Sequence, residues 1–412
     1  MINLVARIRD EFSFFKGNYL ILIATWLIMD ITNEIPTSFF ELYVLELGGT
    51  VVIIGLINFC LKIAFAAVSF PGGHIADKFG RKGILIFSTL AMGFNFLIFA
   101  FAPDWRFILL AMVTGNLLRI SNPALQAITA DSLPPKKRGL GYSIQQITID
   151  LTSTPAPLLA SLLFEYFGFV SGMRVAYIFV SASYFIAGII RYRLTETLDG
   201  AERIKLGELL LAFPRSYVES FKMLFTIPES LRYLIVTNNL FSFAGSFFGS
   251  YIIVYATTDL GLSKYEWSLV LTAQAILTTL LIIPIGKAID VFGAKKMMII
   301  FYILIMVTIV LTISANFLVL FIVMPLMGIA YSASGAGFQK LTADLTQRNL
   351  RGKMVGLFRF FSLIVGAVGS LLGGYIYENT AHVNVFIVGF FTLLIGTVLF
   401  AYLVKEPKIE EI

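Results

Sequence analysis

Charged residues are scarce in this chain of 412 residues. Only 14% are Asp, Glu, Lys or Arg, whereas soluble globular domains have about 25%. Hydrophobic residues make up 58%, and the mean hydropathy is +0.86. This balance excludes a soluble enzyme, a disordered chain, a collagen and a coiled coil. The long apolar runs also lack the alternation of a membrane barrel strand and favour helices, which satisfy their own backbone hydrogen bonds in lipid.

Metal-binding and nucleophilic residues are equally rare. The single cysteine, Cys60, excludes a disulfide framework, and two histidines, His74 and His382, are too few for a zinc or haem site. No Gly-rich phosphate loop followed by Lys-Ser or Lys-Thr is present, which excludes ATP hydrolysis. We therefore expect no enzyme activity, no metal and no cofactor.

Hydrophobic runs between charged clusters predict twelve membrane-spanning helices. The predicted spans are 18–46, 51–76, 82–102, 105–130, 140–166, 173–194, 231–258, 265–289, 295–315, 318–343, 353–378 and 383–404. The fold class is an all-α membrane protein of two six-helix bundles related by pseudo-twofold symmetry. We predict an N-terminal bundle over 1–194, a linker over 195–230 and a C-terminal bundle over 231–412. The linker segment 204–224 mixes apolar and charged residues and is either interfacial helix or flexible chain.

Lys and Arg residues are distributed asymmetrically between the two sides of these spans. One side contains basic turns at 78–82 and 136–138 and the stretch from Arg191 to Arg232. The turns on the other side contain only Arg106, Arg174 and Lys264. Basic loops stay in the cytoplasm. We therefore expect both termini in the cytoplasm of a prokaryote and the protein in its plasma membrane. The net charge of +6 then reflects topology, and no nucleic acid is expected as a partner.

The chain also contains an internal repeat, because two blocks recur 213 residues further on without a gap. In the first block Pro71, Gly73, Asp77, Phe79, Gly80 and Lys82 fall on Pro284, Gly286, Asp290, Phe292, Gly293 and Lys295. In the second, Gln126, Thr129, Ala130, Asp131, Arg138 and Gly139 fall on Gln339, Thr342, Ala343, Asp344, Arg351 and Gly352. A duplicated six-helix unit, with both copies in the same orientation, explains the shared offset.

The stretch Gly73-His-Ile-Ala-Asp77-Lys-Phe-Gly80-Arg81-Lys82 resembles the signature of the major facilitator superfamily of secondary transporters. The resemblance implies twelve spans and a gating latch between the two halves. Its residues would be Gly73, Asp77, Gly80, Arg81, Lys82, Asp131, Arg138, Gly286, Asp290, Gly293, Asp344 and Arg351. Glycine at positions 80 and 293 permits tight turns between helix ends. The alternative is that these charges only set topology.

Charged residues inside the predicted spans are the sharper signal, since one at a helix centre costs about 2.5–3.5 kcal/mol even on lenient scales. Glu34 and Glu41 lie about 40° and 20° round the first span from Asp30, so the three acids share a stripe. Spans two and four contain Lys62 and Arg119. This pattern indicates a polar cavity.

From these charges we predict proton coupling by Asp30, Glu34 and Asp150. Substrate binding is assigned to Asp30, Glu34, Lys62, Arg119, Asn58, Asn116, Gln146 and Asn239. Acids in span one and an arginine in span four resemble the drug/proton antiporter branch of the superfamily, although Ser121-Asn122-Pro123 stands where that branch prefers Gln-Gly after the arginine. A static buried network remains an alternative for the same charges.

The preferred hypothesis is a secondary transporter that exports a small amphipathic or cationic compound by alternating access, coupled to protons. Uptake or exchange of an anionic metabolite held by Arg119, Lys62 and Arg359 is a second hypothesis. A receptor or scaffold that no longer transports is a third, from another class. The expected partners are a small-molecule substrate, protons and membrane lipids, and the expected state is a monomer.

Overall fold

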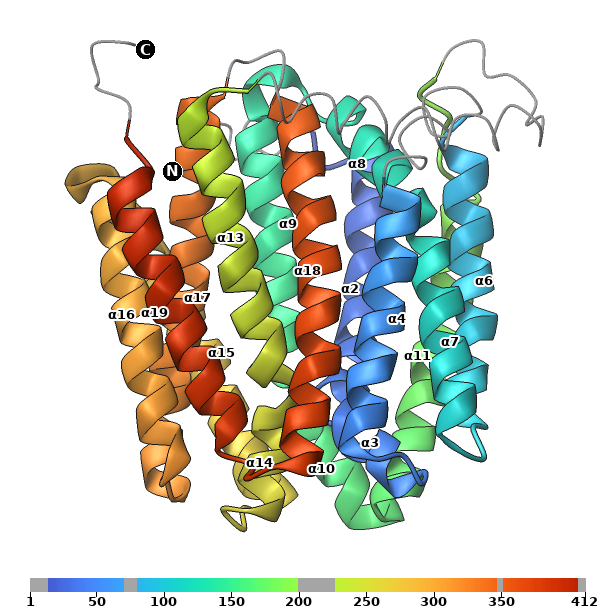
Figure 1. Ribbon diagram of the computed structural model, residues 1–412. Helices are drawn as coiled ribbons and strands as arrows, with labels where there is room; N and C mark the ends of the chain where they lie inside the picture. The colour runs from blue at the N-terminus through green and yellow to red at the C-terminus, as the bar shows by residue number, and fades with distance from the viewer. Residues whose placement is uncertain (1–13, 70–79, 199–226, 347–350, 407–412) are drawn as a thin grey trace, which may run out of the picture. The chain divides into compact units, whose positions relative to one another are not determined.

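The computed structural model describes residues 14–69, 80–198, 227–346 and 351–406 (Figure 1). All regular elements in these ranges are helices. Twelve of the helical stretches are long and apolar enough to cross a membrane, which confirms the predicted fold class. The predicted helix within 204–224 lies outside the described residues.

The helices up to the central linker are α2 (Gly17–Thr37), α3 (Phe40–Glu46), α4 (Val51–Ser69), α6 (Lys82–Ala100), α7 (Trp105–Leu118), η1 (Arg119–Ser121), α8 (Asn122–Asp131), η2 (Pro135–Lys137), α9 (Arg138–Ser153), α10 (Ala156–Phe167) and α11 (Phe169–Arg191). Those after it are α13 (Glu229–Phe248), η3 (Gly249–Tyr251), α14 (Ile252–Thr258), α15 (Lys264–Phe292), α16 (Ala294–Ile313), α17 (Phe317–Leu345), α18 (Arg351–Asn379) and α19 (Asn384–Leu403).

Several spans that the hydropathy pattern predicts as continuous are divided, and three of the divisions coincide with proline. The first span stops at Thr37, one residue after Pro36. The fourth changes to the 3₁₀ segment η1 just before Pro123, and the fifth breaks next to Pro155. Proline has no N–H to donate and its ring clashes with the preceding helical turn, so the α-helix cannot continue unchanged. The hydropathy pattern does not reveal these breaks.

The chain forms two compact units. The first comprises residues 1–38, 67–102 and 113–215, and the second comprises 39–66, 103–112 and 216–412. This division differs from a cut at the linker because α3 and most of α4 contact helices of the second half, as when Val52 N–H donates to Glu378 at 2.7 Å. The predicted division into bundles at 194 and 231 stays a prediction.

In the first unit, α11 packs against α6, α2 and α10. Tyr19, Leu22 and Trp26 on α2 form a buried cluster with residues of α6, α8 and α11. The Tyr19 hydroxyl donates to the carbonyl of Gly141 on α9 at 2.7 Å. These contacts fix α2, which contains the candidate acidic residues, within the unit.

In the second unit, α13 packs against α18 and α19, and α17 packs against α15 and α16 (Figure 1). The approach of α18 to α13 requires glycine: a Cβ at Gly373 would stand 2.0 Å from the carbonyl oxygen of Phe247, and one at Gly369 would stand 2.7 Å from that of Phe243. These two glycines therefore permit the close packing of α18 against α13.

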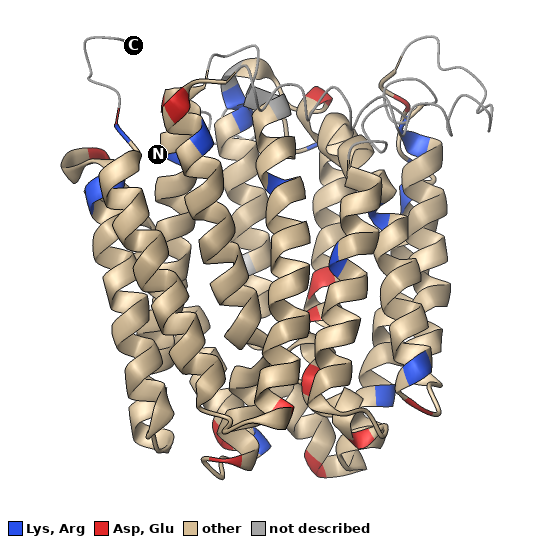
Figure 2. Ribbon diagram, in the orientation of Figure 1, with Lys and Arg blue, Asp and Glu red and all other residues tan. Residues whose placement is uncertain are grey.

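Charged residues gather at the helix ends, and few lie along the middle turns (Figure 2). This distribution is expected of helices whose central parts face lipid or other helices. The exceptions on the middle turns define the candidate site.

Candidate functional site

The first unit holds two carboxylates on one helix. Asp30 and Glu34 lie one turn apart on α2, are both partly buried, and interact electrostatically with each other. The predicted stripe does not extend to Glu41, because α2 ends at Thr37 and Glu41 lies on α3 in the other unit. The acidic part of the site is therefore Asp30 with Glu34.

A buried guanidinium lies close to this pair. Arg191, the last residue of α11, is 3% exposed and interacts electrostatically with Asp30. Its Nε donates to Thr25 at 3.2 Å and one terminal nitrogen donates to Thr89 at 2.6 Å. The other terminal nitrogen has no hydrogen-bond partner among the described residues. Such contacts stabilise the charge of a buried arginine, and here the N–H groups of one terminal nitrogen remain unpaired among the described residues.

Tyr184, two turns before Arg191 on α11, connects these groups. It interacts electrostatically with Asp30, Glu34, Arg191 and Arg119. Nearby, the hydroxyls of Thr32 and Ser183 share a hydrogen bond of 2.8 Å that ties α2 to α11. We call Asp30, Glu34, Arg119, Tyr184 and Arg191 the acid–arginine cluster.

Other predicted residues of the first unit lie on α7, η1 and α9. Asn116 is 6% exposed on α7, and Arg119, in the 3₁₀ segment η1, is exposed. Gln146 is exposed on α9. Asp150 is also on α9, but its side chain lies outside the described part of the structure. Its role in proton coupling stays a prediction.

Lys62 belongs to the second unit and is held by neutral oxygens. Its ammonium donates to Ser246 Oγ and Ser370 Oγ at 2.7 Å each and to the Gly366 carbonyl at 3.2 Å. One turn earlier on α4, the Asn58 amide donates to Ser250 at 3.2 Å. Three contacts match the three protons of an ammonium, so a ligand of Lys62 would have to displace one of them.

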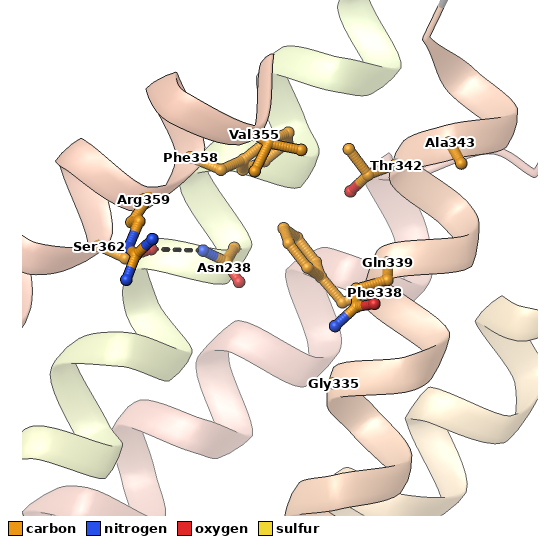
Figure 3. Close-up of a pocket in the computed structure, with 10 residues that line it drawn as sticks. All are labelled: Asn238, Gly335, Phe338, Gln339, Thr342, Ala343, Val355, Phe358, Arg359 and Ser362. Atoms are coloured by element: carbon orange, nitrogen blue, oxygen red, sulfur yellow. Dashed lines mark hydrogen bonds between the residues drawn. The ribbon is translucent and has the colours of Figure 1, made fainter. Parts of the chain in front are cut away.

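The second unit also contains a cavity between α13, α17 and α18 (Figure 3). Asn238 and Arg359 line it, and the Asn238 amide donates to Ser362 at 2.7 Å. The predicted ligand residue Asn239 follows on α13, and its buried Oδ1 has no partner among the described residues. Nothing in the sequence alone singled out the cavity.

The predicted latch of the first half centres on Arg81. Gly80 has a φ of +86°, so the tight turn expected there is present. Arg81 forms an ion pair with Asp131, and it donates to Thr197 at 3.1 Å. Arg138 donates to the Ala130 carbonyl at 3.2 Å. Gly73 and Asp77 lie outside the described residues.

A distant carboxylate completes this end of the first unit. Glu196 accepts from the backbone N–H groups of Arg81 and Lys82 at 3.0 and 2.9 Å, which are orphan donors at the start of α6. Burial alone would raise the pKa of Glu196, but hydrogen bonds from four backbone N–H groups outweigh it and lower that pKa.

The second half repeats the plan with different partners. Gly293 has a φ of +88°, and Glu406 accepts from the N–H of Ala294 at the start of α16 at 2.9 Å. Asp290 pairs with Lys340 at 2.6 Å. Asp344 lies one turn beyond Lys340 on α17.

Two further latch residues of this half show less. A Cβ on Gly286 would meet open space, so no close approach explains that glycine. The side chain of Arg351 is not among the described ones. The gating role of all twelve latch residues stays a prediction.

Twelve apolar spans with an acid–arginine cluster in one unit and a lined cavity in the other define a polytopic helical membrane protein with polar interior sites. The model of the Major Facilitator Superfamily matches residues 20–255 and again residues 234–412. The chain belongs to this superfamily and is a secondary transporter of small molecules, not an enzyme.

Relatives by sequence include two proteins named for a transport activity. A Na⁺, Li⁺, K⁺/H⁺ antiporter of Planococcus maritimus is 32% identical over 154 residues, which is 35% of this chain and 35% of that protein. The multidrug resistance protein MdtH of Proteus mirabilis is 22% identical over 347 residues, 82% of this chain and 80% of that one.

Solved structures support the fold. A mutant of the nucleoside transporter NupG is 14% identical with a TM-score of 0.76, covering 94% of this chain and all (100%) of that one. A bacterial homologue of the human lysosomal transporter Spinster is 15% identical with a TM-score of 0.71, covering 93% and 95%. At such identities the likeness concerns the fold alone.

Proposed function

We propose that the chain is a proton-coupled antiporter that exports a small amphipathic or cationic compound across the plasma membrane. The observation that carries the proposal is the acid–arginine cluster, in which two carboxylates on α2 interact with each other and Asp30 interacts with a buried arginine. Carboxylates inside a membrane span are costly and are retained mainly where they bind ions, protons or substrate.

The names of two relatives support proton-coupled export as the type of function. One is named as an antiporter that exchanges alkali cations for protons and another as a multidrug resistance protein. A carboxylate that releases its proton on one side and takes it up on the other would serve such an exchange. Asp30 and Glu34 are the described residues of this chain best suited to that exchange.

In the proposed cycle, one carboxylate of the pair takes up a proton when the site opens outward and releases it when the site opens inward. A cationic compound competes with the proton for the same negative charge, because two ligands cannot both neutralise it. Arg191 keeps the pair from accumulating two uncompensated charges. Alternating access then converts the proton gradient into export.

The test is transport in proteoliposomes with an imposed pH difference. The double variant Asp30→Asn with Glu34→Gln is expected to lose pH-gradient-dependent transport. Glu165→Gln is the matched control, because Glu165 is an exposed acid on α10 of the same unit. It is expected to behave as wild type. Full gradient-dependent transport by the double variant would overturn the coupling assignment.

Uptake or exchange of an anionic metabolite is the second candidate. Lys62 does not favour it, because its protons are already bound by Ser246, Ser370 and Gly366. Arg359 does, since it lines the cavity of the second unit. Transport of an organic anion that is unchanged in the double variant Asp30→Asn with Glu34→Gln would select this candidate over the first. We further propose a monomer with both termini in the cytoplasm.

A further inference from the structure

The cavity of the second unit has a volume of about 650 Å³, enough for a small organic molecule. It lies between α13, α17 and α18 (Figure 3). Its lining includes the side chains of Asn238, Phe338, Gln339, Thr342, Phe358 and Arg359. All six residues belong to the second compact unit, so residues of the first unit are not needed to form the cavity.

An aromatic pair forms one wall of the cavity. The rings of Phe338 on α17 and Phe358 on α18 are perpendicular, with centroids 4.9 Å apart and an interplanar angle of 90°. Phe358 is 4% exposed and thus fixed by packing. Such a pair offers both a ring face and a ring edge, and a planar aromatic ligand can stack on the one and contact the other.

A cation also lines the cavity. The Arg359 guanidinium carbon lies 4.6 Å from the centroid of the Phe65 ring, a cation–π contact that limits its movement. The N–H groups of a guanidinium lie in its own plane, and their spacing matches the two oxygens of a carboxylate. Arg359 therefore supplies a held positive charge to the cavity.

A buried hydroxyl points to a missing ligand. Thr342 is 5% exposed, and its Oγ1 has no hydrogen-bond partner among the described residues. In Figure 3 this hydroxyl lies on the side of α17 that faces the cavity. Buried hydroxyls are nearly always hydrogen-bonded. The Thr342 oxygen is itself covered, so a polar ligand group in the cavity would supply the missing hydrogen bond once the Thr342 side chain rotates toward it.

Comparison of the two copies of the internal repeat shows that the cation and the aromatic pair of the cavity occur in the second copy and not in the first. At the 213-residue offset, Gln146 stands where the second half has Arg359, and Leu125 and Gln145 stand where it has Phe338 and Phe358. The cation and the aromatic pair are thus confined to one copy. A packing role common to both copies would not produce this difference.

We infer that this cavity binds the aromatic, carboxylate-bearing end of the transported compound, with the carboxylate on Arg359, the ring against Phe338 and Phe358, and a hydrogen bond to Thr342. The inference rests on the proposed proton-coupled export and narrows its substrate from a small amphipathic or cationic compound to an amphipathic aromatic anion, which leaves Asp30 and Glu34 to bind the proton alone. The first unit then supplies proton coupling and the second supplies recognition.

The experiment measures binding to the purified full-length protein without any gradient, by equilibrium dialysis and by the thermal midpoint. The probes are naphthoate, its neutral amide naphthamide and the cation naphthylmethylammonium, which share one ring system. Naphthoate alone is expected to bind and raise the midpoint. Arg359→Gln is expected to weaken naphthoate binding about tenfold or more, because a charge-assisted contact is lost. Thr342→Val is expected to weaken it about fivefold.

Arg232→Gln is the matched control, an exposed arginine on α13 outside the cavity, and is expected to bind as wild type does. Arg359→Lys, which keeps the charge, is expected to retain more binding than Arg359→Gln, and unchanged ligand-free midpoints identify folded variants. Equal binding of naphthamide and naphthoate, or naphthoate binding unaffected by Arg359→Gln, overturns the inference. Because no gradient is used, failure here is separate from failure of proton coupling by Asp30 and Glu34.

Discussion

Two cations inside the spans are stabilised in different ways, and substitutions at each should differ in effect. Arg191 has two hydroxyl partners and interacts electrostatically with Asp30, whereas the three described partners of Lys62 are neutral oxygens. Removing one charge of a buried pair leaves the opposite charge unpaired, which is costly. Removing a charge that is held only by neutral groups leaves no unpaired charge behind.

Arg191→Gln is expected to lower the thermal midpoint clearly, by the equivalent of about 2 kcal/mol or more, because hydrogen bonds from a charged donor are lost and Asp30 loses its cation. Arg193→Gln is the control: Arg193 follows two residues later and is exposed. The measurement is thermal unfolding of purified protein. Equal midpoints for the two variants would show that Arg191 does not stabilise the cluster.

Lys62→Met is expected to change the midpoint by less than about 1 kcal/mol, because removing a buried charge also removes its desolvation penalty. Ser370 already donates to the Gly366 carbonyl at 3.1 Å, so that oxygen keeps a partner. Naphthoate binding should persist in this variant. A loss of binding as large as that of Arg359→Gln would instead place Lys62 in the substrate site.

At the scale of helices, the starts of α6 and α16 are capped from far along the chain by Glu196 and Glu406. Neither acid occupies the usual N-cap position, where a side chain serves its own helix. The two caps join the ends of helices that are distant in sequence, and they stand at equivalent places in the two halves of the repeat.

Glu196→Ala is expected to destabilise the protein by about 1 kcal/mol, and Glu406→Ala by about half as much, because Glu196 accepts from two N–H groups at the start of its helix and Glu406 from one. The lowered pKa of Glu196 sets the pH dependence. Its contribution is complete above the ordinary glutamate value of about 4.3 and is lost as the pH falls through its own lower pKa.

The difference between Glu196→Ala and wild type, measured as thermal midpoints from pH 7 downward, should therefore be constant to about pH 5 and then shrink. Glu196→Gln should fall between the two, since its amide oxygen still accepts. A difference that grows in acid would contradict the cap.

Helix number and type were predictable from sequence because a membrane span needs about 20 apolar residues, and that signal is strong. Helix breaks at Pro36 and Pro155 were missed because hydropathy averages over them. Arg191 was assigned to the basic loop because it lies at the end of a span, and a sequence position does not show that its side chain is buried within the unit. The cavity around Arg359 depends on side chains from three helices, which no local pattern reveals.

At the scale of the whole molecule, span count and basic loops together predict sidedness. Five candidate spans separate Arg106 from Lys296: 105–131, 138–167, 169–191, 229–258 and 264–292. An odd number of crossings places the two residues on opposite sides of the membrane. The basic-loop rule then assigns Lys296 to the cytoplasm and Arg106 to the outside.

The single cysteine makes this testable, because Cys60→Ser gives a background without thiols. Arg106→Cys and Lys296→Cys in that background place one thiol each at exposed positions. A membrane-impermeant maleimide is expected to label Arg106→Cys in intact cells and Lys296→Cys only after permeabilisation. The reverse pattern would invert the orientation, and labelling of both in intact cells would mean that one of the five spans does not cross. Either result would overturn the predicted topology of twelve spans with both termini in the cytoplasm.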